Sequence, residues 1–305
     1  MRLDIGGQAV VEGVLMKSLR FVTIAVRKKD GTVAFKVEEH LPSKNKFLNL
    51  PIIRGVVKLA LMMKIGTKAL LWSSEVALGE EEEKLTKKEL VFTMAISLVI
   101  GIGLFVLLPY FLASVLGLNE VSQPFYFNLV DGVLKMLIFI AYIVLIARMM
   151  EIKRLFQYHG AEHKTVNCFE AKEDLTVENV KKHSTRHPRC GTTFVVVVFA
   201  ISILVFSVIP SILNYLVPVV ASFSFFMQKI VLFSLRLLFL PLVAGVSFEF
   251  LRIGARYSTN KVISLFLQPG FMFQSLTTRE PDESQIEVAI LSLQKVIQHE
   301  NATPL

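Results

Sequence analysis

Four apolar stretches, each long enough to cross a bilayer, constrain this 305-residue chain more than any other feature. About 20 consecutive apolar residues in a helix span the hydrocarbon core of a membrane, and their backbone groups must be paired within the helix. The sequence therefore predicts an integral membrane protein that is mainly α-helical, with about four transmembrane helices. The predicted spans are Leu90–Gly117, Leu129–Met149, Thr192–Val220 and Phe223–Phe250.

Basic residues are distributed unevenly around these spans. Residues 1–89 hold 16 Lys and Arg, residues 150–191 hold eight and residues 250–305 hold five, whereas the connectors within the two hairpins hold none before Lys229. Because cytoplasmic loops carry the excess of Lys and Arg, we expect a multi-pass protein of the cell membrane with both termini in the cytoplasm. The net charge of +8 then follows the membrane flanks. It predicts the lipid bilayer as partner and no nucleic acid.

The remaining segments complete six predicted units. Phe21–Arg27 and Val33–Val37 alternate in polarity around a Lys29–Gly31 hairpin signal, which predicts strands. Residues 47–78 are apolar but carry cations at helical spacing, which predicts an amphipathic helix at the membrane surface. The units are a small β-rich cytoplasmic unit (1–46), an interfacial amphipathic helix with a charged connector (47–89), a transmembrane hairpin (90–149), a cytoplasmic His/Cys-rich segment (150–191), a second transmembrane hairpin (192–250), and a membrane-hugging loop followed by a C-terminal amphipathic helix (251–305).

Local signals refine the N-terminal unit and the spans. The apolar run Gln8–Leu15 is interrupted by Glu12, and Gly6-Gly7 before it indicates a tight backbone path, a turn before a strand more readily than a ligand-binding loop. Pro109 is expected to end or kink the first span. Asp131 and Lys135 lie four residues apart and are expected to pair near a membrane end.

Two further ionisable residues fall in or near the last span, Arg236 and Glu249. Ionisable groups at membrane depth are costly and therefore mark functional candidates, although Arg236 could also reach an interface or pair with a carboxylate. In the tail, Asn260–Met272 is apolar and broken by Pro269-Gly270, which indicates the membrane-hugging loop. Ser284–Glu287 has the pattern of a capping box before an apolar helical face.

The polar segment between the second and third spans gathers the chemistry-bearing side chains. Four of the six histidines and both cysteines, Cys168 and Cys190, lie between His159 and Cys190. His159-Gly-Ala-Glu162-His163 matches H-x-x-E-H, the inverted zinc-peptidase pattern. On a helix the two histidines share a face, so both imidazoles can point at one ion with Glu162 beside them as a base. We predict zinc, or another divalent transition metal, at His159 and His163, with Glu162 as the catalytic residue.

A catalytic zinc needs three protein ligands and an open position for water. His187 and Cys190 are the favoured additional ligands, because an imidazole and a thiolate suit zinc in a reducing compartment. Glu170 on the same helical face and Glu249 at the end of the last span are alternatives. His183 follows two lysines in a predicted solvated helix end and is less favoured. A site closed by four ligands would be structural, with no position open for chemistry.

With these motifs the sequence resembles the YqhQ-like family of bacterial membrane proteins, a domain of unknown function labelled in general terms as a predicted metal-dependent enzyme. The resemblance covers nearly the whole chain. It implies a membrane location and a metal at the H-x-x-E-H motif, without naming a reaction or substrate. The residues that carry it are Gly6–Val14, Pro51–Val57, Tyr158–Cys168, His187–Thr192, Gln268–Gly270 and Leu276–Asp282.

Two classes of function fit these observations. The first is a metal-dependent hydrolase acting at the cytoplasmic membrane surface on a membrane protein, a peptide or a lipid headgroup. Four cations near the motif would favour an anionic substrate: Arg154, Lys164, Arg186 and Arg189. The second is a non-enzymatic regulator, scaffold or transport-associated protein in which a metal ties the loop to the bundle. The substrate or protein partner stays unknown in either case, and a homo-oligomer stays open.

Overall fold

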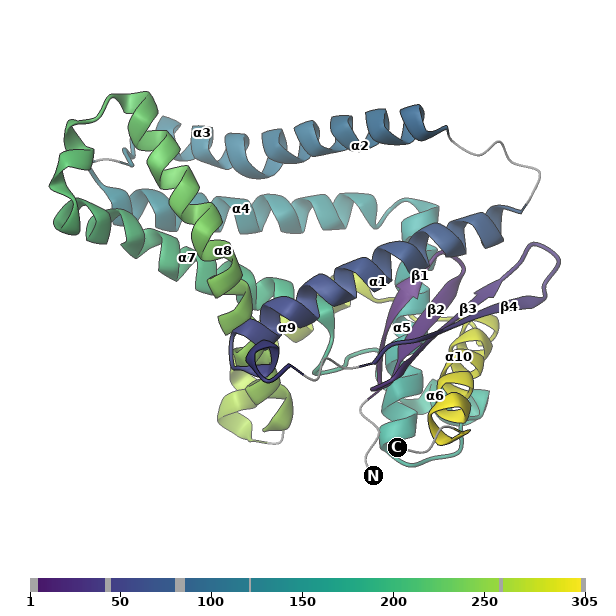
Figure 1. Cartoon of the computed structure of the whole chain (residues 1–305). Coiled ribbons are helices and arrows are strands. Elements are labelled where there is room, and N and C mark those ends of the chain that lie inside the picture. Colours follow the sequence, from purple (N-terminus) through teal and green to yellow (C-terminus); the bar gives the residue numbers. More distant parts are fainter. Residues whose placement is uncertain (1–4, 42–44, 80–85, 121, 258–259, 303–305) are drawn as a thin grey trace.

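The computed structural model describes residues 5–41, 45–79, 86–120, 122–257 and 260–302. It combines a small sheet unit with a group of long apolar helices, and α1 runs between the two parts (Figure 1). The strands are β1 (Gly6–Val10), β2 (Gly13–Lys17), β3 (Phe21–Arg27) and β4 (Val33–Glu39). The helices are α1 (Ile53–Leu78), α2 (Lys87–Ile102), α3 (Leu108–Val115), α4 (Pro124–Ile146), α5 (Met150–Glu170), α6 (Val177–Lys182), α7 (Gly191–Leu216), α8 (Phe225–Arg256), α9 (Lys261–Thr277) and α10 (Glu283–Ala302).

The predicted β-rich unit is a four-stranded antiparallel sheet in the order β1-β2-β3-β4. The expected hairpin between β3 and β4 is present, and Gly31 takes the left-handed conformation (φ +85°) that its turn requires. The apolar run around Glu12 splits into two strands. Glu12 itself has φ +50° in the turn between β1 and β2.

Helices cover both faces of this sheet (Figure 1). Side chains alternate along each strand, so Val14 and Met16 face α5 and α10, whereas Leu15 faces α1. Ile286 and Leu293 of α10 are fully buried against the first face. The sheet is therefore the middle layer of three, and this explains why β2 and β3 are buried along almost their whole length.

The helix predicted for residues 47–78 is present as α1, but it does more than lie on a surface. Its small residues face the sheet: Gly66 touches the side chain of Gln8, and the Ser73 hydroxyl accepts a hydrogen bond from the Val11 amide (3.1 Å). Large apolar side chains such as Met63 point outward. α1 is thus a wall of the sheet unit with an apolar outer face, and contact of that face with the membrane stays a prediction.

The predicted C-terminal amphipathic helix is α10, although the predicted cap is misplaced. The capping residue is Asp282, whose carboxylate accepts a hydrogen bond from the Gln285 amide (2.9 Å). Gln285 returns a bond by accepting from the Asp282 amide (3.0 Å). This reciprocal pair is a capping box two residues before Ser284. An acidic side chain competes well with serine for this position because it also interacts with the helix dipole.

The far end of α10 is fixed to the sheet by Glu300. Its carboxylate accepts hydrogen bonds from the Ser18 hydroxyl (2.6 Å) and from Arg20 Nε (2.9 Å). Burial opposes ionisation of this carboxyl, but the hydrogen bonds and the charge of Arg20 outweigh it and lower the pKa of Glu300. Ionised Glu300 therefore stabilises the docking of α10.

Four helical segments are long and apolar enough to cross a membrane, in agreement with the predicted number. The second begins at Pro124 instead of Leu129, because proline is readily accommodated in the first turn of a helix. In the first, a π-helical turn at Gly103–Leu107 comes just before Pro109, the predicted kink. The four segments are Val91–Val115, Pro124–Ile146, Gly191–Pro210 and Phe226–Gly254.

Charged side chains in these helices are paired. Lys135 binds Asp131, as the spacing predicted. Arg236 binds Glu120 from the connector between the first two spans (2.8 Å), and Lys229 binds the same carboxylate. Of the alternatives considered for Arg236, the structure therefore shows the pairing with a carboxylate. The pairing lowers the cost of placing these charges in an apolar layer.

The membrane-hugging loop predicted for Asn260–Met272 is a helix, α9, and the prediction of a break at Pro269-Gly270 was wrong. A proline inside a helix removes one backbone hydrogen bond. Packing offsets this loss, since Gly270 lies so close to Thr193 of α7 that a side chain at 270 would collide with it. This packing places Thr277, the last residue of α9, beside His159 of α5.

Candidate metal centre

The H-x-x-E-H motif lies in the middle of α5, which packs against β1, β2 and α10. Arg154 and Tyr158 hold this helix to the β1–β2 turn through the carboxylate of Glu12, with 3.3 Å between the Tyr158 hydroxyl and Glu12. His159 and His163, four residues apart, project from one side of α5, and their ring centroids are 4.4 Å apart. The predicted pairing of two imidazoles on one helical face is therefore present.

Both imidazoles are oriented by backbone carbonyls. His159 Nδ1 lies 2.8 Å from the carbonyl oxygen of Thr277, and His163 Nδ1 lies 2.5 Å from that of Thr185. Because a carbonyl oxygen only accepts, each Nδ1 must carry a proton, so Nε2 is the nitrogen that is free to bind a metal in the neutral form of each imidazole. This tautomer is the one that a metal-ligating histidine needs, with the second nitrogen fixed by an outer partner.

Cys190 completes a three-ligand group. It is the N-cap residue of α7, and its Sγ lies 3.3 Å from His159 Nε2. One ligand atom from each of His159, His163 and Cys190 lies within 4.8 Å of the others. Ligand atoms around a tetrahedral zinc ion with bonds of 2.0–2.3 Å are about 3.3–3.8 Å apart. Small side-chain rotations would therefore bring these three atoms onto one ion. The amide of Thr192 donates to Cys190 Sγ (3.4 Å), which holds the side chain at the start of α7.

Glu162 lies beside this group and is almost fully buried. Its Oε2 is 3.5 Å from His163 Nε2, and the backbone amide of Gly7 donates to the carboxylate. Burial raises the pKa of Glu162, and the nearby histidines His159 and His187 only partly offset the effect. A carboxyl of this kind holds its proton more readily than an exposed one. It is therefore a stronger base than an exposed carboxylate, as a group that accepts a proton from water needs to be.

Gly7 makes this arrangement possible, and the sequence did not indicate its role. A Cβ atom at position 7 would lie 2.8 Å from Glu162 Cγ and 2.9 Å from Oε1, and would also collide with the carbonyl of Leu15. At Gly6 a Cβ would meet nothing within 4 Å. The pair was expected to form a turn, whereas it opens β1, and its second glycine lets the strand backbone touch the buried carboxyl.

His187 is a neighbour of the three-ligand group and not a member of it. It is buried, and its ring centroid lies 5.8 Å from that of His163. Its Nε2 lies 3.4 Å from Glu170, and its Nδ1 accepts from the Arg189 amide (3.4 Å). Both ring nitrogens therefore have partners other than a metal. Glu170, the alternative ligand, is held by His187 and Arg189; its pKa is lowered chiefly by the hydrogen bond from His187, against burial.

The second alternative ligand, Glu249, lies elsewhere in the structure. Its carboxylate forms a two-pronged pair with Arg54 near the start of α1, and Arg252 lies 3.8 Å from it. This contact fastens α1 to α8. The structure therefore gives Glu249 a role in joining the sheet unit to the last span, and does not bring it to the histidines.

Gln274 of α9 is a supporting residue that sequence reasoning missed. It is fully buried, accepts a hydrogen bond from the His187 amide (3.0 Å), and donates to the His187 carbonyl (2.8 Å) and to the Thr193 hydroxyl (2.7 Å). It clamps the turn that leads to Cys190. The signal that could have revealed it is a lone amide directly after the apolar run Phe271–Phe273, since a buried amide needs several partners.

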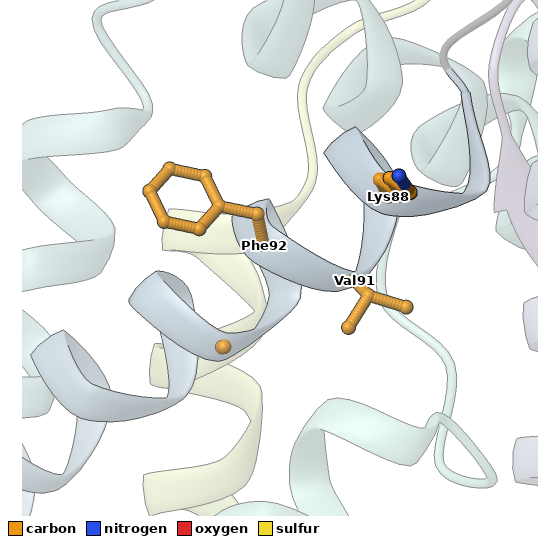
Figure 2. Close-up of a pocket in the computed structure, with 4 residues that line it drawn as sticks. Lys88, Val91 and Phe92 are labelled. Atoms are coloured by element: carbon orange, nitrogen blue, oxygen red, sulfur yellow. The ribbon is translucent and has the colours of Figure 1, made fainter.

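A surface hollow occurs on α2, and its lining includes no residue of the metal-capable group. Lys88, Val91, Phe92 and Ala95 line it. Figure 2 shows the side chains of Val91 and Phe92 projecting from one helix. Both belong to a candidate membrane span and are about two-thirds exposed, so this face suits contact with lipid chains.

These features define a class. The chain is a multi-pass membrane protein with a small sheet unit, and a group of two histidines and a cysteine could hold a metal ion where that unit meets the spans. It belongs to the family described as "Protein of unknown function (DUF1385)", whose family model matches residues 50–299. This confirms the resemblance seen in the sequence.

One similar protein is "Uncharacterized protein YqhQ" of Bacillus subtilis (strain 168). It is 32% identical over 321 aligned positions, which cover 97% of this chain and 92% of the relative. No solved structure matches the chain.

Proposed function

We propose that this protein is a zinc-dependent hydrolase whose centre lies at the cytoplasmic face of the cell membrane. The observation that carries the proposal is the convergence of one ligand atom from each of His159, His163 and Cys190, with both imidazoles oriented by backbone carbonyls. Three protein ligands leave one position of a tetrahedral ion for water. The cytoplasmic placement rests on the excess of Lys and Arg in residues 1–89 and 150–191.

The residues around the centre have separate roles in this proposal. A zinc ion held there would act as a Lewis acid and make a water molecule acidic enough to react near neutral pH. Glu162 would accept a proton from the attacking water and pass it to the leaving group. Gly7 donates its amide to Glu162 and holds the carboxylate in place. Thr277 and Thr185 keep the two imidazoles in register through their carbonyls.

The cations near the centre favour an anionic substrate less strongly in the structure than the sequence predicted. Three of the four nearby cations are already in ion pairs, so their attraction for an anionic substrate is reduced. Arg154 pairs with Glu12, Lys164 with Glu280 and Arg189 with Glu170. We therefore propose an amide or ester bond of a membrane protein, peptide or lipid headgroup as the target, without a requirement for strong negative charge.

A non-enzymatic role with a structural metal is the second candidate, and burial favours it. His163 is 1% exposed and Cys190 7%. The ligands and their carbonyl partners come from α5, the segment between α6 and α7, and the end of α9, so a metal would tie the sheet unit to two apolar helices. In this role the protein would be a regulator or scaffold, and loss of a ligand would lower the stability of the fold.

The first test is elemental analysis of the full-length protein purified in detergent. The wild type should contain zinc or another transition metal, and His163→Ala should lose metal from this centre. His299→Ala, a substitution on α10, is the matched control and should keep it. Absence of any bound transition metal from the wild-type protein would remove both candidate roles.

Glu162→Gln separates the two roles. The amide has the same shape and removes only the proton acceptor, so this variant should keep its metal. If the centre is hydrolytic, turnover of peptide, membrane-protein or phospholipid ester substrates should fall by about 100-fold or more, the usual contribution of a general base. Unchanged turnover in Glu162→Gln would refute the hydrolase and leave the structural role.

A further inference from the structure

A second group of metal-capable side chains lies at the far end of α5. One ligand atom from each of Cys168, Glu173 and His183 lies within 4.8 Å of the others. His183 Nε2 is 3.2 Å from Glu173 Oε2, which is close to the separation of about 3.3 Å expected for two such ligands on one zinc ion. From the sequence, His183 was expected to lie in a solvated helix end and was the less favoured ligand.

The chain builds this group with a sharp reversal after α5. Lys172, just past the helix end, takes the left-handed conformation (φ +62°) that glycine usually adopts there. A lysine in this conformation costs about 1–2 kcal/mol. The Glu173 amide then donates to the Cys168 carbonyl (3.2 Å), and the Asn179 side chain donates to the Asp174 carbonyl (3.1 Å). Residues 173 and 174 are thereby folded back over Cys168.

The donor set suits a divalent transition metal. A thiolate and a carboxylate neutralise a charge of +2, and an imidazole adds a neutral nitrogen; sulfur with nitrogen is the combination that zinc prefers. Cys168 is buried, whereas Glu173 and His183 are reached by solvent, so an ion has a path of entry. Without an ion, the Cys168 thiol donates to the Asp174 carbonyl (3.7 Å), and a metal would take the place of that proton.

The simpler explanation of this group is that Cys168 is a core residue that happens to lie next to a surface pair of Glu173 and His183. An exposed pair contributes about 0.2–1 kcal/mol, which is less than the strain at Lys172. It also gives no reason for a thiol to be the core residue that meets the pair. A shared ion accounts for the strained turn and for the three different donors together.

We propose that Cys168, Glu173 and His183 form a second transition-metal site of zinc-binding type, distinct from the centre at His159, His163 and Cys190. The proposal does not rest on the function proposed above.

The second site would fix the segment that supports the first. His183 begins residues 183–187, which run back along α5. Within this segment the Thr185 carbonyl holds His163 Nδ1 (2.5 Å), and the carbonyls of Ser184 and Arg186 accept from the Asn167 side chain (2.8 and 3.0 Å). An ion at His183 would anchor the start of this segment and therefore the orientation of His163.

The chain contains two cysteines, one in each group, which makes the two sites separable by spectroscopy. Cobalt(II) bound to a thiolate absorbs in the near ultraviolet through charge transfer from sulfur, and this signal requires the cysteine. We would titrate cobalt(II) into full-length, detergent-purified, metal-stripped protein: wild type, Cys168→Ser, Cys190→Ser and the double variant. Size-exclusion elution and circular dichroism of each metal-stripped variant would confirm an unchanged fold.

The second site predicts that Cys190→Ser keeps a thiolate–cobalt band, and that Cys168→Ser added to it removes the band. His183→Asn in the Cys190→Ser background should weaken cobalt binding by at least 10-fold, whereas His299→Asn should not change it. A Cys190→Ser protein that is folded and shows no band would overturn the second site. A band in Cys168→Ser reports on the first centre alone, so either site can fail while the other stands.

Discussion

Replacement of Gly7 by alanine tests whether the strand backbone really touches the buried carboxyl of the centre. The added methyl group would lie 2.8 and 2.9 Å from two atoms of Glu162 and would collide with the Leu15 carbonyl across the β1–β2 pair. The carboxylate cannot move away freely, because it is buried among the histidines. Either Glu162 rotates off its present position or β1 separates from β2.

The size of the effect follows from these contacts. A single methyl group forced into a packed site costs about 1–3 kcal/mol. Gly6→Ala is the matched control, since the same methyl group there meets nothing within 4 Å and needs no unusual backbone angle. It should be neutral, or stabilise slightly by reducing the freedom of the unfolded chain.

The assay is thermal or denaturant unfolding of both variants without metal, followed by cobalt(II) titration of each. Gly7→Ala should unfold more easily than wild type, and any hydrolytic activity should fall with the displacement of Glu162. Gly6→Ala should match the wild type in both measurements. Equal losses in the two variants, or no loss in either, would refute the close contact between Gly7 and Glu162.

Two further predictions concern stability. The pKa of Glu300 is lowered in the folded protein, so its contribution to the free energy of unfolding is present above the ordinary value of 4.5 and is lost as the pH falls through the lowered value. Glu300→Gln should therefore be less stable than wild type at neutral pH, and the difference should shrink in acid. Unfolding measured as a function of pH would test this. Gly132→Ala should weaken the packing of α4 on α7, because its methyl group would collide with Ile203, whereas Gly101→Ala meets nothing within 4 Å; the melting temperature in detergent should fall only for the former.

The four spans and the sheet unit could be predicted because each depends on a local pattern. Runs such as Val195–Val198 can only be buried or face lipid, and the β-branched and aromatic residues of Phe21–Arg27 are typical of a strand. The helix at Lys261–Thr277 was missed because its proline is tolerated only through the contact of Gly270 with Thr193. That contact joins residues far apart in the sequence, and no local pattern reports it.

In the candidate centre, too, the local pattern was predictable and the long-range contacts were not. The helical spacing of His159 and His163 was enough to place them together, but the choice of a third ligand depended on how the chain returns to α5. Cys190 lies within reach because it caps α7, whereas His187, three residues earlier, is turned toward Glu170 and clamped by Gln274. Chain topology and a buried amide decide between two equally suitable side chains.

The Glu162 carboxyl is the residue that best distinguishes a catalytic from a structural metal centre. A buried carboxyl whose pKa is raised binds its proton more tightly in the folded state, so without metal it lowers stability as the pH rises above its ordinary value. A structural site gains nothing from that cost, and Glu162→Gln would relieve it without changing the shape of the side chain. The metal-free Glu162→Gln variant should therefore be more stable than wild type at neutral pH. Greater stability together with lost turnover is the trade expected of a catalytic group, whereas greater stability with unchanged function would leave Glu162 without a chemical role.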